Sequence, residues 1–189
     1  MTRFNSEDHL ARYIEFGEFP SIHRPMVEAV QWACPDDARF LDLGACFGLL
    51  GAAVQTLRPK AVVIGVERSA SAIELAQKYG LPCQLVRMHV SRETVTELAG
   101  LIRKFKLNTV IARRVLPELW GGDLEGGRMF AKTLRDAGIR QVLLEGRRPT
   151  GAPKSPLSTV ELESAMLSPH FKEAGRPQGS TPIIVMEAS

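Results

Sequence analysis

The sequence predicts a protein of the α/β class, with a mixed, mainly parallel sheet of about seven strands and helices on both faces. From residue 39 onward, short β-branched runs alternate with amphipathic segments, a pattern typical of successive strand–helix–strand units. The last two strand-like runs lie too close together for a crossover helix, so they should form an antiparallel hairpin. The 189 residues, 44% of them hydrophobic, fit one globular domain.

The predicted elements alternate regularly along the chain. We expect parallel strands at residues 39–45, 61–68, 83–90, 109–116 and 141–147, with helices between them at 46–58, 70–79, 92–106 and 122–137. After a loop rich in turn formers at 146–156, we expect a helix at 158–167 and hairpin strands at 170–177 and 181–188. The sheet should therefore become mixed at its C-terminal edge.

The first 37 residues contain two helical patterns, at 7–17 and 23–33. They are too short for a core of their own, so we expect a helical cap, residues 1–37, on a single domain whose core is 38–189. Several cap side chains could fold over a ligand or could simply dock a hydrophobic face on the sheet. They are Tyr13, Phe16, Phe19, His23 and Arg24.

The charge and cysteine patterns indicate which partners, metals and cellular location to expect. The formal net charge is +3, but residues 101–150 carry eleven Lys and Arg against five Asp and Glu, so the basic excess is local. Cys34, Cys46 and Cys83 lack the paired spacings of a zinc or redox site, and the histidines are equally scattered, so we expect no metal. No stretch resembles a signal peptide or a membrane span, which predicts a cytoplasmic protein without a membrane partner.

The first predicted strand runs into a glycine loop, FLDLGACFGLLG at residues 40–51. In a doubly wound sheet this loop lies at the edge where ligands bind. Gly44 and Gly48 would permit tight turns and a close approach of a ligand to the backbone. The dinucleotide fingerprint requires glycine at its third and sixth positions, where this chain has Cys46 and Leu49. A nicotinamide dehydrogenase is therefore disfavoured.

Two acidic residues indicate the kind of ligand. Asp42 precedes the loop, where a carboxylate would repel a pyrophosphate but would suit a cationic or hydrogen-bond-donating ligand. Glu67 ends the second strand 25 positions later, near the distance at which an acid takes the hydroxyls of a ribose. The pair predicts a nucleoside without phosphates. The alternative is that Glu67 pairs with Arg68 or Arg87 on the surface.

These motifs resemble those of the class I S-adenosylmethionine-dependent methyltransferases, which have a Rossmann-like fold. Their opening motif is an acid, one residue, a glycine and a second glycine four positions later, as in residues 42–48 here, and residues 65–80 are similar to their second strand and helix. The likeness covers 39–189, including the hairpin. It implies S-adenosylmethionine as cofactor, held by Asp42, Gly44, Ala45, Cys46, Gly48, Glu67, Arg68, His89, Val90 and Arg113.

The chain departs from this family at two places. His89 stands where the family commonly has an acid that contacts the adenine amino group; the imidazole could accept that bond, stack on the base, or bond a neighbour. Methyltransferases of amino groups carry an Asn/Asp-Pro-Pro-aromatic run after the fourth strand, but this chain has Arg-Arg-Val-Leu at 113–116. A guanidinium cannot accept a hydrogen bond from an amine, so that mechanism is disfavoured.

Two arginine pairs are expected at the ends of adjacent strands, Arg113 with Arg114 and Arg147 with Arg148. Because side chains alternate along a strand, one member of each pair should face the site. Forked guanidinium hydrogen bonds suit a carboxylate or phosphate, which predicts an anionic substrate. Alternatively, the arginines pair with acids at the rim: Glu118, Asp123, Glu125 and Glu145.

The segment 117–127 is rich in glycine, which predicts a mobile loop that could act as a lid. Within it, Trp120 could form a wall for a flat substrate or could pack in the interior. No residue stands out as a general base, and Glu118 and His23 are the candidates.

The sequence therefore predicts methyl transfer to an anionic acceptor, either a small molecule or a nucleic acid. Because the amine-binding run and a clear base are missing, the alternative is a binding or regulatory module that keeps the methyltransferase fold without catalysis. The basic stretch 101–150 would also permit nucleic-acid association. The sequence leaves the oligomeric state open.

Overall fold

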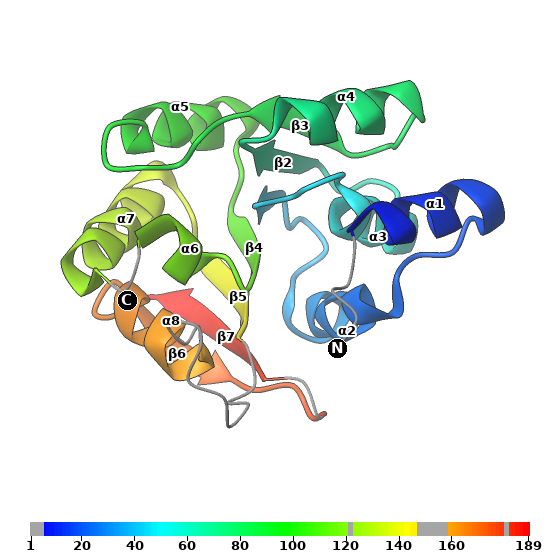
Figure 1. Cartoon of the computed structure of the whole chain (residues 1–189). Helices are drawn as coiled ribbons and strands as arrows, with labels where there is room; N and C mark the ends of the chain where they lie inside the picture. The colour runs from blue at the N-terminus through cyan, green and yellow to red at the C-terminus, as the bar shows by residue number, and fades with distance from the viewer. Residues whose placement is uncertain (1–5, 121–122, 147–158, 180–181) are drawn as a thin grey trace, which may run out of the picture.

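A seven-stranded sheet with helices on both faces forms the centre of this computed structural model (Figure 1). The structure describes residues 6–120, 123–146, 159–179 and 182–189, except the side chains of residues 6, 7, 117 and 118. The strands are β1 (Phe40–Leu43), β2 (Val63–Glu67), β3 (Gln84–Arg87), β4 (Thr109–Arg113), β5 (Gln141–Glu145), β6 (Phe171–Gly175) and β7 (Ile183–Ala188). The predicted fold class is confirmed.

The order of the strands across the sheet is β3-β2-β1-β4-β5-β7-β6. β1 to β5 run parallel, whereas β7 pairs antiparallel with both β5 and β6, as the hairpin argument predicts. The chain winds outward from β1 to β3 and then returns to place β4 on the other side of β1. The carboxyl ends of β1 and β4 therefore lie at the point where the strand order reverses, which is where ligands bind in such sheets.

Two layers of helices cover the sheet. The helices are α1 (Ser6–Phe16), α2 (Arg24–Ala33), α3 (Leu49–Leu57), α4 (Ala70–Lys78), α5 (Val95–Phe105), α6 (Leu116–Trp120), α7 (Leu124–Ala137) and α8 (Val160–Leu167), with a short 3₁₀ turn η1 (Ser21–His23) before α2. α5, α7 and α8 cover one face, and α2 and α3 cover the other (Figure 1).

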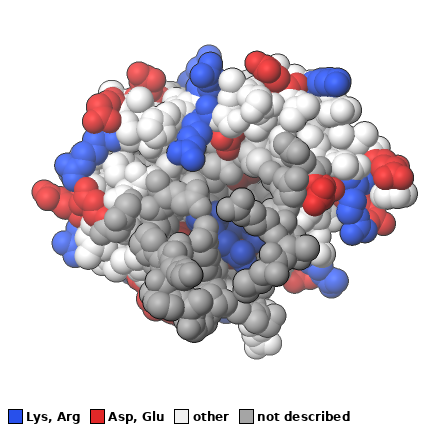
Figure 2. All heavy atoms as spheres, in the orientation of Figure 1, with Lys and Arg blue, Asp and Glu red and all other residues white. Residues whose placement is uncertain are grey.

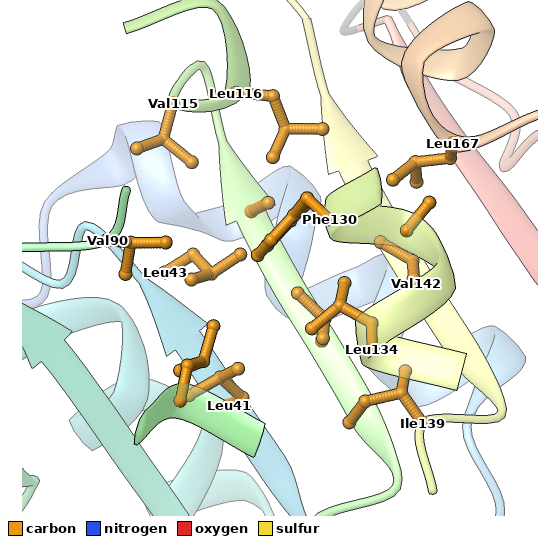
Figure 3. Close-up of a cluster of buried hydrophobic side chains, with 14 of the residues drawn as sticks. Leu41, Leu43, Val90, Val115, Leu116, Phe130, Leu134, Ile139, Val142 and Leu167 are labelled. Atoms are coloured by element: carbon orange, nitrogen blue, oxygen red, sulfur yellow. The ribbon is translucent and has the colours of Figure 1, made fainter. Parts of the chain in front are cut away.

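Strand alternation creates a core on each face. Leu41 and Leu43 of β1 belong to the cluster with Phe130 and Leu134 of α7, and these side chains point toward one another in Figure 3. Phe40, one residue before Leu41, belongs to the opposite cluster with α2 and α3. Asp42 shares the side of Phe40, because residues two apart on a strand face the same way. A carboxylate is thus buried in the layer between the sheet and helices α2 and α3.

The N-terminal residues pack unequally. α2 buries Met26, Ala29 and Val30 against α3, β5 and β7, so it belongs to the core. α1 buries Leu10 in a smaller cluster with Phe47 of the glycine loop. Among the described residues, no helix is long and apolar enough to cross a bilayer.

The region after β4 differs from the prediction. β4 ends at Arg113 and not at 116. The described residues of 117–127, which were predicted to form a mobile loop, lie mostly in α6, which ends at Trp120, and in α7, which begins at Leu124 within the helix predicted at 122–137. Proline in the first turn favours the start of α6, and Asp123 caps α7 by accepting hydrogen bonds from the amides of Glu125 at 3.1 Å and Gly126 at 3.0 Å. β3 also ends early, at Arg87, which leaves residues 88–90 in a loop.

Candidate functional site

Two adjoining cavities lie at the carboxyl ends of β1, β2 and β4. The large cavity, about 460 Å³, is lined mainly by Glu67, Arg68, Met88, His89, Val90, Arg114, Val115 and Leu119. The small cavity, about 150 Å³, lies against α1 and η1 and is lined by His9, Ile22, His23, Asp42, Ala45, Phe47, Leu49 and Leu50. Leu43, Gly44, Cys46 and Arg113 line both cavities, so the glycine loop and the end of β4 form the boundary between them.

The glycine loop depends on left-handed backbone at three alternate positions. Gly44, Cys46 and Gly48 have φ angles of 68°, 51° and 75°, and only Cys46 carries a side chain there. A Cβ at Gly44 would lie 2.7 Å from Cγ2 of Val115, so the loop also lies directly against the residues that follow β4. Cys46 thus occupies the position that fails the dinucleotide fingerprint, yet it adopts the conformation that glycine favours.

Glu67 ties the glycine loop to the start of α4. Its carboxylate accepts hydrogen bonds from the amides of Cys46 and Ser69, each at 2.8 Å. These bonds to backbone, and not a surface pair with Arg68 or Arg87, hold the side chain in the wall of the large cavity. Each oxygen keeps a second lone pair for a ligand hydroxyl.

Asp42 is a buried acid beside the small cavity. Its side chain is 2% exposed, and one carboxylate oxygen, Oδ2, has no hydrogen-bond partner among the described residues. Burial raises the pKa of Asp42 to about 7; the negative charge of Glu67 adds to this rise, and a hydrogen bond from the Gly51 backbone opposes it. A buried, unpartnered oxygen that faces a cavity favours a ligand group that donates hydrogen bonds.

His23 faces the same cavity in its neutral form. Its Nδ1 atom is buried without a partner among the described residues. Burial, and then the positive charges of Arg113 and His9, lower the pKa of His23 to about 3. At physiological pH the ring is therefore uncharged and presents one nitrogen as an acceptor.

Arg113 and Arg114 both pair with Glu145 at the end of β5. Arg113 Nε lies 3.0 Å from one carboxylate oxygen, and an Arg114 terminal nitrogen lies 2.9 Å from the other. Both arginines line the large cavity, so the expectation that only one faces the site is wrong. The reason is that Arg114 leaves the strand in a left-handed conformation, with φ at 58°, which turns its side chain toward the same carboxylate. Figure 2 shows Lys and Arg side chains in the middle of the face seen there.

The other predicted site residues are distributed as follows. His89 and Val90 line the large cavity from the loop after β3. Trp120 is 7% exposed and packs on Phe130, with ring centroids 5.4 Å apart, so it lies in the core. Asp123 pairs with Arg92. The Glu118 side chain and the pair Arg147 and Arg148 lie outside the described residues.

Sequence reasoning missed Glu145 as a site residue and treated it as one of several rim acids. The register of β4 and β5 places Glu145 directly beside Arg113. The predicted order of adjacent strands would have singled out this acid, because it alone ends the strand next to the arginines. Met88 and Leu119, which line the large cavity, carried no such signal.

Comparison with solved structures identifies the fold, whereas no family model and no curated protein matches the sequence. An S-adenosylmethionine-dependent methyltransferase from Anabaena variabilis superposes with a TM-score of 0.66 at 13% identity, over 99% of this chain and 96% of its own. A candidate O-methyltransferase from Nostoc punctiforme superposes with a TM-score of 0.59 at 17% identity, over 93% of this chain and 60% of its own. TrmN from Thermus thermophilus superposes with a TM-score of 0.57 at 17% identity, over 87% of this chain and 48% of its own.

This chain thus spans about half to three fifths of the length of the latter two proteins and nearly all of the first. These likenesses agree with the strand order of the sheet and the antiparallel position of β7. The protein has the fold of the class I S-adenosylmethionine-dependent methyltransferases.

Proposed function

We propose that this protein transfers a methyl group from S-adenosylmethionine to an anionic acceptor. The observation that carries the proposal is the pair of adjoining cavities, in which Glu67 and Asp42 flank the glycine loop and Arg113 stands at their boundary. One cavity suits a nucleoside and the other suits a short polar tail. Together they match the two halves of this cofactor.

The large cavity fits the adenosine half. Glu67 has free lone pairs for the two ribose hydroxyls, and its own bonds to Cys46 and Ser69 fix its position. His89 and Val90 line the same cavity, where an imidazole can stack on or bond to an adenine ring. Figure 1 places the loop after β3, which carries both residues, beside the end of β2.

The small cavity fits the amino-acid half. The buried Oδ2 of Asp42 has no hydrogen-bond partner among the described residues, and the neutral ring of His23 has one nitrogen that accepts, so both side chains can bind an ammonium group. These residues would hold the amino-acid tail beside the glycine loop.

When bound, the cofactor's sulfonium supplies an electrophilic methyl group, so the protein mainly provides alignment and a dry site. Arg113 and Arg114 would orient the acceptor through its negative charge. The low pKa makes His23 a poor proton acceptor near neutral pH, so it serves better as a neutral hydrogen-bond acceptor for the ligand. An acceptor that is already ionised, such as a carboxylate or a phenolate, needs no base.

Calorimetric titration with S-adenosylmethionine and S-adenosylhomocysteine tests the cofactor, with NAD as the negative control. Absence of binding at millimolar concentration would refute the proposal. If the cofactor binds, labelled-methyl transfer to fractionated metabolites, nucleic acid and protein identifies the acceptor. Binding without transfer to any fraction would instead support a binding or regulatory module. Retention on nucleic acid that weakens steeply with salt would point to a nucleic-acid acceptor.

A further inference from the structure

Glu145 is the most deeply buried acid beside the candidate site. Its residue exposure is 0%, and it ends β5 in direct register with Arg113 on β4. Its two oxygens lie 3.0 Å from Arg113 Nε and 2.9 Å from an Arg114 terminal nitrogen. A buried carboxylate between two guanidinium groups is costly to desolvate, so its position requires a reason beyond simple stability.

The backbone is shaped to bring both arginines to this acid. Successive side chains of an extended strand point to opposite faces, so Arg113 and Arg114 could not otherwise reach one carboxylate. Arg114 adopts a left-handed φ of 58°, and its amide donates to the carbonyl of Glu145 at 2.8 Å. A left-handed conformation is unfavourable for a residue with a side chain, and the two contacts with Glu145 offset that cost.

The arrangement leaves donors for a ligand. Within the described residues, Arg113 contacts Glu145 through Nε, which leaves its two terminal nitrogens for the cavity. The Arg113 and Arg114 side chains are 20% and 39% exposed, and both line the large cavity. Two guanidinium charges against one carboxylate leave an excess of one positive charge at this wall. Arg113 offers both terminal nitrogens and Arg114 offers the one that Glu145 does not contact, and such a group of guanidinium donors suits a tetrahedral or planar oxyanion.

We propose that Glu145 is a positioning residue that fixes Arg113 and Arg114 as a two-armed receptor for a carboxylate or phosphate group of the methyl acceptor. The inference rests on the proposed function, because it assigns the acceptor's charged group to this wall of the same site. Positioning and simple charge predict opposite effects of neutralising Glu145. Loss of the negative charge alone would strengthen anion binding, whereas loss of the clamp would let the two cations repel each other and separate, and so weaken it.

The test uses inorganic phosphate as the probe, titrated into the full chain saturated with S-adenosylhomocysteine. The Arg113 Nε–H resonance in an NMR spectrum reports binding at this wall.

We expect Glu145→Gln to weaken phosphate binding about tenfold while S-adenosylhomocysteine affinity changes less than about twofold. Asp136→Asn, which removes one acid from an exposed cluster with Lys132 and Arg135, is the matched charge control and should leave both affinities unchanged. Phosphate affinity equal to or above that of the wild type in folded Glu145→Gln would overturn the proposal.

A second pair of variants guards against misfolding of Glu145→Gln. Arg114→Gly accepts the left-handed φ without strain and removes the whole side chain, the guanidinium included, so the chain should fold while phosphate affinity drops. Arg114→Lys keeps the positive charge but lacks the planar guanidinium. It should restore less than half of the phosphate affinity that Arg114→Gly loses. Full restoration by lysine would show that charge alone is sufficient and would contradict the positioning role. Failure of the cofactor titration would refute the proposed function separately, because phosphate binding to the free protein can still be measured.

Discussion

Asp42 and His23 face the small cavity and respond oppositely to pH. The pKa of His23 falls from 6.5 to about 3 in the fold, so the stability that its neutral ring contributes is present above pH 6.5 and is lost as the pH falls toward 3. The pKa of Asp42 rises from 3.8 to about 7, so the folded state binds the extra proton and loses stability as the pH rises through that window. Burial thus disfavours the charged form of both side chains. A zwitterionic ligand would bring charges that can pair with them.

We expect Asp42→Asn to raise the free energy of unfolding at pH 8 and to change it little at pH 4. The buried charge is costly only when Asp42 is ionised, and at about 1.4 kcal/mol per pKa unit the gain is at most about 4 kcal/mol. Denaturant unfolding at a series of pH values measures the difference. A gain of equal size at pH 4 would show that ionisation is not its source.

The same variant should lose affinity for a ligand that carries an ammonium group. We expect S-adenosylhomocysteine to bind about 10- to 100-fold more weakly to Asp42→Asn, because a charge-assisted hydrogen bond is lost. 5′-Methylthioadenosine, which has no amino-acid tail, should bind the variant and the wild type alike. If calorimetry shows that both ligands weaken equally, Asp42 acts on the loop and not on the tail.

Cys46 is a residue with a side chain in a left-handed backbone conformation that favours glycine. Its φ of 51° is open to glycine but strongly disfavoured for a β-branched residue. We therefore expect Cys46→Val to have a free energy of unfolding about 1–3 kcal/mol below that of Cys46→Gly. Thermal and denaturant unfolding of the two variants provide the comparison. Equal stability of the two variants would mean that the loop relaxes away from the left-handed region.

At the scale of elements, the β1–α3 loop and the turn after β4 lie against each other, and Gly44 is their contact. We expect Gly44→Ala to lower the free energy of unfolding by about 2–4 kcal/mol, because φ is 68° and the new Cβ would lie 2.7 Å from Val115 Cγ2. Gly17→Ala is the matched control, because Gly17 has the same φ of 68° with nothing within 4 Å. It should show the backbone cost alone.

A double-mutant cycle separates the clash from the backbone cost. Val115→Ala should recover about 1–2 kcal/mol in the Gly44→Ala background relative to its effect in the wild type. The residual loss should match that of Gly17→Ala. Additive effects of the two substitutions would show that the loop and the turn are not in contact in solution.

Element existence was predictable from the sequence more fully than element ends. β2 follows from its β-branched run, but the run at 109–116 continues past the true end of β4 at Arg113. Nothing in the residue type marks Arg114 as left-handed, since arginine rarely adopts that conformation. Asp123, which the sequence suggested as a rim partner for the arginines, instead caps α7 at the start of the helix predicted at 122–137.

For the whole molecule, the sequence could predict which residues meet only where strand order was known. Asp42 and Glu67 were predictable because each lies at the carboxyl end of one of the first two strands. The Arg113–Glu145 contact also depends on β4 and β5 being neighbours in a particular register. The N-terminal helices carry no motif that places them. Their position against the glycine loop is set by tertiary packing of single side chains, Leu10 among them.

α1 is the least integrated helix at the site, which makes its removal informative. Leu10 is its buried anchor, on Phe47, while Ile14 and Phe16 are 44% and 61% exposed. A chain that begins at residue 18 should therefore keep the sheet and the α2 core. Its free energy of unfolding should fall by only about 2–3 kcal/mol, roughly the contribution of one buried leucine with its neighbours.

The small cavity would lose the wall that includes His9, so we expect S-adenosylhomocysteine to bind about tenfold more weakly and 5′-methylthioadenosine to bind unchanged. Calorimetry on the truncated chain measures both, and Ile14→Ala in the full chain is the control for an exposed position on the same helix. Unchanged affinity for S-adenosylhomocysteine would place the amino-acid tail away from α1, whereas global unfolding would show that α1 belongs to the core.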